Sequence, residues 1–299
     1  MSKPGRGKTT EASNRTSFKA NVRPPGAQIV LTQEDQFGLA DSDLAHWQKH
    51  FGVDAAAIRH DYAVSRVIEA LAPYSDLFCF YGGTALSRTL LQGLRLSEDI
   101  DLLSSVPRRE SAPILDRALR VGLADRFGPV TASLALQDAP HDVTPCVYQV
   151  GDANIQIQLI SPDHFPPWPH QRTVVSQRYL GVPDVELETY SAQAFPCAKT
   201  SALFDRGLPR DLYDVWALAE AGWITPEAAL MFKRFGLTRC FPRRFMFPHR
   251  VPTESQWEDA LGGLCVLRVG PKEAYDSAVD AWERAVAAAE ASSGEGSNV

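Results

Sequence analysis

Residues 78–103 constrain the fold of this chain more than any other segment. Residues 78–81 are apolar and aromatic and predict a short buried strand. Gly82 and Gly83 follow at once, and Thr84 is predicted to cap a short helix that ends near residue 91. Because glycine has no Cβ atom, backbone at this turn can approach a phosphate closely, and free N–H groups at a helix start favour an anion. The segment therefore predicts a strand and a turn that binds phosphate.

Two acidic residues open the next predicted strand. Asp99 and Asp101 are two residues apart, so both side chains point to one face of a strand while Ile100 points into the core. Adjacent carboxylates repel each other, whereas a divalent cation between them reverses that balance, and hard cations such as Mg²⁺ favour carboxylate oxygens. A glycine pair or an acid pair alone is common in proteins without such a function. Their order and spacing here favour metal-assisted chemistry on a nucleoside triphosphate.

These motifs resemble the AbiEii/AbiGii-type nucleotidyltransferase toxins, which include the MenT-like toxins and belong to the polymerase-β-like nucleotidyltransferase superfamily. The resemblance rests on residues 82–87, GGTALS, and residues 95–101, RLSEDID. It implies that Asp99 and Asp101 are catalytic and hold Mg²⁺ or Mn²⁺ on the triphosphate. It also implies a set of nucleotide-binding residues in this region: Gly82, Gly83, Thr84, Ser87, Arg95 and Ser97.

A second signature lies about one hundred residues further on, in residues 194–220. The pattern predicts two helices separated by a Gly-Leu-Pro break. Lys199 and Arg206 are seven apart, hence on one face of the first helix, and Asp211 and Asp214 are three apart on the second. We therefore expect cations and carboxylates to converge at a helix junction.

This region resembles the later motif of the same family, a lysine helix followed by Arg-Asp-x-x-Asp. The resemblance implies that Lys199 meets the triphosphate and that Asp211 is catalytic, as a candidate base near the reacting centre. Arg206 and Arg210 are predicted to bind the nucleotide phosphates or to pair with the acids. For Asp214 two interpretations are open, a part in the site and a structural partner for an arginine.

Two features depart from the family pattern. A hairpin is predicted over residues 143–160, and its second strand would usually supply a third carboxylate, but Gln156 and Gln158 stand there. Glutamine is neutral and takes no proton at neutral pH. Many family members also have lysine before the glycine pair, where this chain has Tyr81. These departures leave open which residue activates the acceptor hydroxyl. They also leave open which cations neutralise the triphosphate.

A helix predicted over residues 54–71 carries Asp61 and Tyr62, a pair that the family commonly shows before its glycine motif. A structural interpretation, with Tyr62 in the core and Asp61 at the surface, is equally open.

The densest basic segment, residues 233–250, has aromatic residues interleaved with its cations. Cations meet phosphates and aromatic rings stack on unpaired bases, so this segment is a candidate RNA contact. A basic loop tied to acidic neighbours, with buried phenylalanines, is the alternative. The cations proposed for RNA are Lys233, Arg234, Arg239, Arg243 and Arg244.

Composition limits the remaining choices. Charged residues make up 22% of the chain and apolar residues 44%, which is ordinary for a soluble globular protein, and we expect a cytoplasmic protein without a membrane span. The net charge is −6, although residues 1–25 carry six Lys or Arg and one Glu. The acidic remainder argues against a general nucleic-acid binder. The five scattered cysteines argue against a zinc site or a disulfide framework.

The predicted organisation is an α/β protein of two lobes with the active site between them. Residues 1–25 are expected to be a disordered basic tail, residues 26–190 a nucleotidyltransferase core with a mixed sheet, and residues 191–299 a mainly helical lobe. We expect a monomer. The resemblance implies a toxin of a toxin–antitoxin pair that transfers NMP from an NTP to the 3′ end of tRNA, with an antitoxin as partner. The alternatives are a small-molecule (antibiotic-type) or protein acceptor, and a degenerate fold that binds a nucleotide or partner without catalysis.

Overall fold

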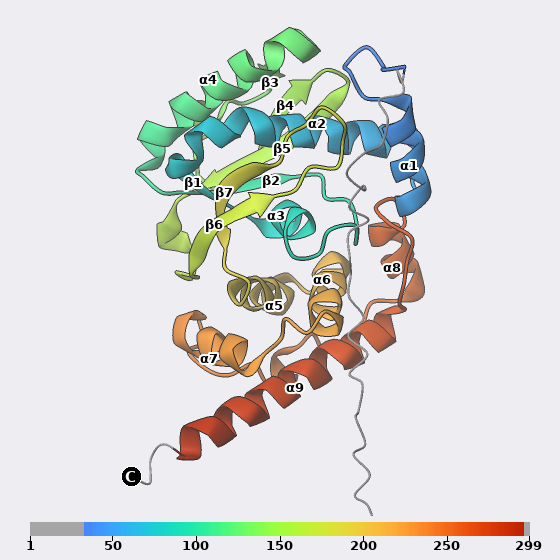
Figure 1. Cartoon of the computed structure of the whole chain (residues 1–299). Coiled ribbons are helices and arrows are strands. Elements are labelled where there is room, and N and C mark those ends of the chain that lie inside the picture. The colour runs from blue at the N-terminus through green and yellow to red at the C-terminus, as the bar shows by residue number, and fades with distance from the viewer. Residues whose placement is uncertain (1–32, 296–299) are drawn as a thin grey trace, which may run out of the picture.

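The computed structural model describes residues 33–295, so the predicted basic tail lies outside the described residues. Figure 1 shows two lobes: an α/β lobe with a central sheet, and a lobe of helices beneath it. The predicted α/β class is confirmed. Among residues 33–295, no helix combines the length and the apolar character that crossing a bilayer requires.

The sheet is mixed and has the strand order β3-β4-β5-β2-β1-β7-β6. Strands β1 and β2 are antiparallel, whereas β1 pairs with β7 and β2 pairs with β5 in parallel. The two central strands therefore carry the glycine turn and the acids side by side. The bounds of the strands are β1 Phe78–Tyr81, β2 Ile100–Ser104, β3 Thr131–Ala132, β4 Cys146–Val150, β5 Ala153–Ile160, β6 His170–Val175 and β7 Val185–Tyr190.

Helices α2 and α4 cover one face of this sheet, and α3 lies on the opposite side, toward the helical lobe (Figure 1). On β5, Ile155, Ile157 and Leu159 are fully buried, which is the alternation expected of a half-covered strand. The side chain of Asp54 caps α2 by accepting a hydrogen bond from the Ala57 N–H. The helices of this lobe are α1 Asp41–Phe51, α2 Ala55–Leu71, α3 Gly82–Arg88 and α4 Arg108–Phe127.

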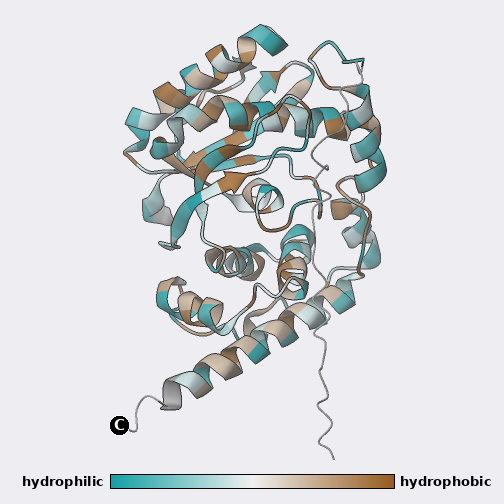
Figure 2. Cartoon of the chain, viewed as in Figure 1, coloured by the Kyte–Doolittle hydropathy of each residue, from teal (hydrophilic) through white to brown (hydrophobic). Residues whose placement is uncertain are grey.

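The second lobe is helical, and its long last helix packs across α6 and α7 (Figure 1). Small residues let this helix approach its neighbours, since Ala274, Ala278 and Ala285 are all buried beside Trp282. Figure 2 shows apolar residues on the strands and on the inward faces of these helices. The helices are α5 Ala194–Arg206, α6 Pro209–Glu220, α7 Pro226–Phe235, α8 Glu254–Leu261 and α9 Pro271–Glu295. Short 3₁₀ turns complete the fold at Ala72–Leu77, Leu136–Asp138, Pro162–His164 and Arg244–Met246.

Two local predictions are corrected by the structure. Thr84 does not cap α3, because that helix begins at Gly82 and Tyr81 precedes it as the N-cap without a side-chain bond. Asp99 lies one residue before β2 rather than within it.

Candidate active site

The acids lie at the edge of the sheet where α3 begins. Asp101 on β2 pairs in register with Tyr81 on β1 and with Gln158 on β5, so the three side chains form a row across three strands. Asp99 precedes the strand, and both acids are half-buried. The pair is thus positioned by the central strands and open toward the helical lobe.

The glycine turn lies directly against these acids. Gly82 has a φ of +79°, which L side chains rarely adopt, and a Cβ there would overlap the carboxylate of Asp101. A Cβ on Gly83 would lie 2.9 Å from Ser97 Oγ, 3.0 Å from Arg95 Nη2 and 3.6 Å from Lys199 Nζ. Three polar groups therefore converge on the side of Gly83 that lacks a side chain.

The second signature meets the first across the two lobes. Lys199 Nζ on α5 lies 2.8 Å from Asp214 Oδ2 and 3.8 Å from Asp211 Oδ1, both on α6. Arg95 donates from Nε and Nη2 to the two oxygens of Asp214, at 2.7 Å each. The expected convergence of cations and carboxylates is present, and it joins the loop before β2 to the helical lobe.

Arg95 and Asp214 form a structural pair in this arrangement. Both are almost fully buried, and Arg95 Nη1 also donates to the Leu96 carbonyl oxygen. The structural interpretation of Asp214 therefore has direct support. The predicted contact of Arg95 with a nucleotide stays a prediction, with Nη2 as the group that faces Gly83.

Two predicted nucleotide ligands have their hydroxyls directed to the backbone. Thr84 Oγ1 donates to the Asp99 carbonyl oxygen, and Ser87 Oγ donates to the Thr84 carbonyl oxygen at 3.0 Å. Both side chains are buried. They tie α3 to the acid loop, so any contribution of theirs to nucleotide binding would come through positioning.

The two remaining arginines pair with acids. Arg206 donates from Nε and Nη2 to the two oxygens of Asp211, at 2.6 and 2.8 Å, although half of its side chain is exposed. Arg210 lies 3.3 Å from the Glu98 carboxylate and donates to the Ala260 carbonyl oxygen. Both arginines are therefore at the rim of the site.

Electrostatics at the acids favour a bound cation. Burial raises the pKa of Asp101 to about 6, although Lys199 opposes this, and the charge of Asp99 adds to it. Burial, with Glu98 nearby, also raises the pKa of Asp99. Among the described residues no cluster of three or more His, Cys, Asp or Glu forms a metal site. A pair of carboxylates still fits Mg²⁺, which proteins commonly bind through one or two carboxylates together with substrate phosphates.

The glutamines on β5 do not replace the missing carboxylate. Gln158 beside Asp101 donates from Nε2 to the Val143 carbonyl oxygen at 2.8 Å, and Gln156 is half-buried two residues earlier. Tyr81, at the position where lysine is common, is buried between the rings of Phe165 and Tyr190. The cations of the site therefore come from α5, from α6 and from Arg95 in the loop before β2.

A cluster of buried charged side chains lies behind α3. The sequence analysis pointed to Asp61 but not to its partners. Asp61 on α2 accepts hydrogen bonds from Arg88 at 2.9 Å, from Arg178 at 3.0 Å and from Tyr179 at 2.8 Å. Arg178 also donates to the Ser87 carbonyl oxygen. Asp61 is therefore buried rather than at the surface, and two guanidinium groups share its charge beneath the helix that follows the glycine turn. The Asp-Tyr pair was the sequence signal for this cluster.

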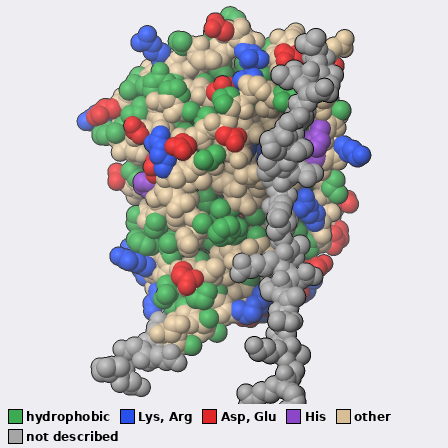
Figure 3. All heavy atoms as spheres, viewed as in Figure 1, with side chains coloured by type: hydrophobic (Ala, Val, Ile, Leu, Met, Phe, Trp, Pro, Cys, Tyr) green, Lys and Arg blue, Asp and Glu red, His purple; other side chains and the backbone are tan. Residues whose placement is uncertain are grey.

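Two arginines of the basic segment pair with acids of α9. Arg243 lies 2.5 Å from Glu290, and Arg244 lies 3.1 Å from Glu283. Lys233 and Arg234 lie over the rings of Phe241 and Phe235, and Arg239 donates to the Arg234 carbonyl oxygen. Phe241 and Phe247 are buried, whereas Phe245 is 74% exposed. These contacts favour the structural alternative, and the RNA contact stays a prediction. Figure 3 shows the charges of both signs interspersed on the viewed face.

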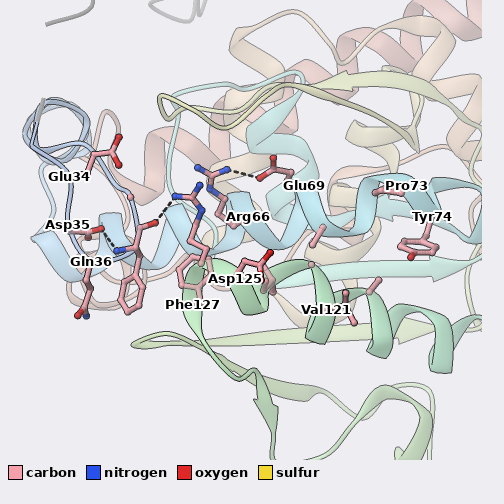
Figure 4. Close-up of a pocket in the computed structure, with 17 residues that line it drawn as sticks. Glu34, Asp35, Gln36, Arg66, Glu69, Pro73, Tyr74, Val121, Asp125 and Phe127 are labelled. Atoms are coloured by element: carbon pink, nitrogen blue, oxygen red, sulfur yellow. Dashed lines mark hydrogen bonds and ion pairs between the residues drawn. The ribbon is translucent and has the colours of Figure 1, made fainter. Parts of the chain in front are cut away.

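A large groove of about 740 Å³ lies away from this chemistry. Figure 4 shows it between α2, α4 and residues 34–38, with Arg66 and Glu69 paired along its wall. Neither acid of the site lines it. Its size therefore does not make it the active site.

The buried pair at Asp214 gives a prediction for acid stability. Burial alone would raise its pKa, but Arg95 and Lys199 hold it at about 2, against an ordinary 3.8. Because the folded pKa is the lower one, this stabilisation is present above about pH 4 and is lost as the pH falls toward 2, by about 2 kcal/mol. Urea unfolding at pH 5, 4, 3 and 2 measures it. At pH 5 the Asp214→Asn variant should be less stable than the wild type, and its free energy of unfolding should fall less between pH 5 and pH 2. An equal fall in both proteins would contradict the low pKa assigned to Asp214.

Comparison with known proteins gives a family match and similar solved structures. The family model described as the nucleotidyl transferase AbiEii toxin of type IV toxin–antitoxin systems matches residues 66–264. Among solved structures, MenT4, a nucleotidyltransferase toxin from Mycobacterium tuberculosis, shares 16% identity over 82% of this chain and 89% of its own, with a TM-score of 0.55.

A candidate nucleotidyltransferase from H. pylori matches over 80% of this chain and 98% of its own, at 15% identity and a TM-score of 0.48. Comparison with curated protein sequences gave no significant match. The likeness to MenT4 supports the fold, and the family model covers both signatures of the site. This chain therefore belongs to the AbiEii nucleotidyltransferase toxin family.

Proposed function

We propose that this toxin transfers a nucleoside monophosphate from an NTP to the 3′ end of tRNA in a metal-dependent reaction, which would block translation and growth. The observation that carries the proposal is the juxtaposition of the acid pair, the glycine turn and Lys199. Carboxylates, close-approach backbone and a cation are the three components that a bound triphosphate requires.

In the proposed reaction the acceptor hydroxyl oxygen bonds to the α-phosphorus, and the bond from that phosphorus to the pyrophosphate oxygen breaks. Asp99 and Asp101 would hold Mg²⁺ or Mn²⁺, which neutralises charge on the triphosphate. Lys199, whose Nζ would lie 3.6 Å from a Cβ on Gly83, would neutralise the leaving pyrophosphate.

The proton of the acceptor hydroxyl needs a base, and Asp211 is our candidate. Asp211 is buried and its two oxygens are bonded to Arg206. The half-exposed Arg206 is free to exchange this carboxylate for an incoming phosphate, which would release Asp211 for the hydroxyl. Arg206 and Arg210 thus remain proposed phosphate ligands. The type IV family description also supports an antitoxin as partner.

The experiment uses purified protein, total tRNA, Mg²⁺ and each α-labelled NTP in turn, with Asp99→Ala as the inactive variant. Label on tRNA that requires Asp99 would establish the reaction and identify the nucleotide. A labelled product that resists RNase would indicate a protein or small-molecule acceptor instead. Nucleotide binding without transfer to any acceptor would favour a non-catalytic binding protein.

A further inference from the structure

A second groove, of about 430 Å³, lies between the first half of α2 and the turn of the β4–β5 hairpin. One wall is a single face of α2, because its residues 56, 59, 60 and 63 recur at helical spacing. The opposite wall consists of Val150, Asp152, Ala153 and Asn154 of the hairpin. The side chains used in the argument are Phe37, Arg59, His60, Tyr62, Phe127 and Asn154.

This groove lies near the loop that carries Asp99. The His60 Nε2 atom lies 3.2 Å from the carbonyl oxygen of Glu98, the residue immediately before Asp99. On the other wall, Asn154 and Gln158 lie on the same face of β5, and Gln158 is opposite Asp101. Four residues of a strand span about 13 Å, so the groove lies one or two nucleotide lengths from the acids.

The lining has the chemistry of a nucleoside site. Tyr62 and Phe127 are buried and form an apolar floor with the partly buried Phe37. Polar groups of Asn154 and His60 stand at the rim. The guanidinium of Arg59 lies 3.5 Å from Asp35, so its charge is largely balanced. The lining also holds the carboxylates of Asp35 and Asp152, and Asp152 accepts a hydrogen bond from Gln36 at 3.4 Å. An aromatic floor with polar donors and acceptors suits a base and its ribose, whereas these acids would repel a phosphate.

The position also suits the acceptor rather than the NTP. The glycine turn, Arg95 and Lys199 lie on the β1 and α3 side of Asp101, where the triphosphate is proposed to bind. The groove lies on the other side, past β5. We propose that it is a subsite for a nucleoside of the acceptor RNA close to the reacting 3′ end. This inference rests on the proposed function for its choice of acceptor.

The test narrows the groove and removes its polar rim. Ala56→Trp places a large side chain on the α2 wall. Asn154→Ala removes an amide that is exposed to solvent, so the substitution leaves no buried polar group without a partner. Loss of contacts with one base amounts to roughly 1–3 kcal/mol, or roughly 5- to 150-fold, so we expect KM for tRNA to rise at least 5-fold in Ala56→Trp. We expect a smaller rise in Asn154→Ala, and NTP affinity within twofold of the wild type in both. Ala288→Trp on α9 and Gln171→Ala on β6, at exposed positions far from the groove, are the matched controls.

Direct binding of tRNA, measured by fluorescence anisotropy without NTP, separates this inference from the proposed function. An unchanged KM and unchanged tRNA binding in both groove variants, with NTP affinity retained, would overturn the subsite. If the wild type transfers no nucleotide to tRNA, the proposed function fails, and the tRNA-binding measurement alone tests the subsite. Weaker RNA binding in the groove variants than in the controls would then support the subsite, and equal or absent binding would overturn it.

Discussion

Asp101→Asn is expected to reduce nucleotidyl transfer strongly and, in the absence of metal, to make the folded protein more stable. The substitution keeps the shape of the side chain but removes the charge that would hold a cation beside Gly82, so transfer should fall by on the order of 10³-fold. Burial raises the pKa of Asp101 to about 6, so the folded protein at pH 7 carries the cost of ionising this carboxyl. Asparagine avoids that cost, and the free energy of unfolding should rise by about 3 kcal/mol.

The two readouts are the labelled-NTP assay and urea unfolding at pH 7 in EDTA. Glu186→Gln is the matched control, because Glu186 is an exposed carboxylate on β7 of the same sheet. It should leave transfer unchanged and alter stability by less than about 0.5 kcal/mol. An Asp101→Asn protein that is less stable than the wild type would show a structural carboxylate, and near-normal transfer would remove Asp101 from the catalytic site.

The parts of the site that are local in sequence could be predicted well. The strand, the glycine turn and the acids at residues 78–103 form one continuous unit, because alternation and backbone freedom act over a few residues. The break between α5 and α6 was predicted as well, since Gly207 adopts φ +63° and Pro209 starts the next helix. Convergence of the charges at that junction followed from helical spacing.

The partners of those charges could not be predicted, because they depend on distances between elements. Arg95 reaches Asp214 from 119 residues away, and Arg178 reaches Asp61 from 117 residues away. Arg178 lies in a loop without periodicity, so no pattern marked it. The same limit applies to the basic segment, whose acids stand on α9, 36 to 47 residues further along the chain.

Asp61→Asn is expected to lower the free energy of unfolding more than Asp101→Asn or Asp214→Asn. The Asp61 side chain is 2% exposed, and those of Arg88 and Arg178 are 0% and 6% exposed. Burial alone would raise its pKa, but Arg178 and Arg88 hold it below the ordinary value, so the carboxylate is charged at neutral pH. Its removal leaves two buried guanidinium groups without a carboxylate, a change that typically costs about 3–5 kcal/mol. Urea unfolding at pH 7 measures this loss.

Glu69→Gln is the matched control, because Glu69 is a partly exposed carboxylate on the same helix, 2.8 Å from Arg66. A pair at the surface contributes about 0–1 kcal/mol, so the two variants separate buried from exposed charge. Arg178 also bonds the Ser87 carbonyl oxygen at the end of α3, and α3 begins with the glycine turn. At temperatures where Asp61→Asn remains folded, NTP affinity should therefore fall in this variant but not in Glu69→Gln. A loss of stability below 1 kcal/mol with normal NTP affinity would show that the guanidinium groups find other partners and that α3 does not depend on this cluster.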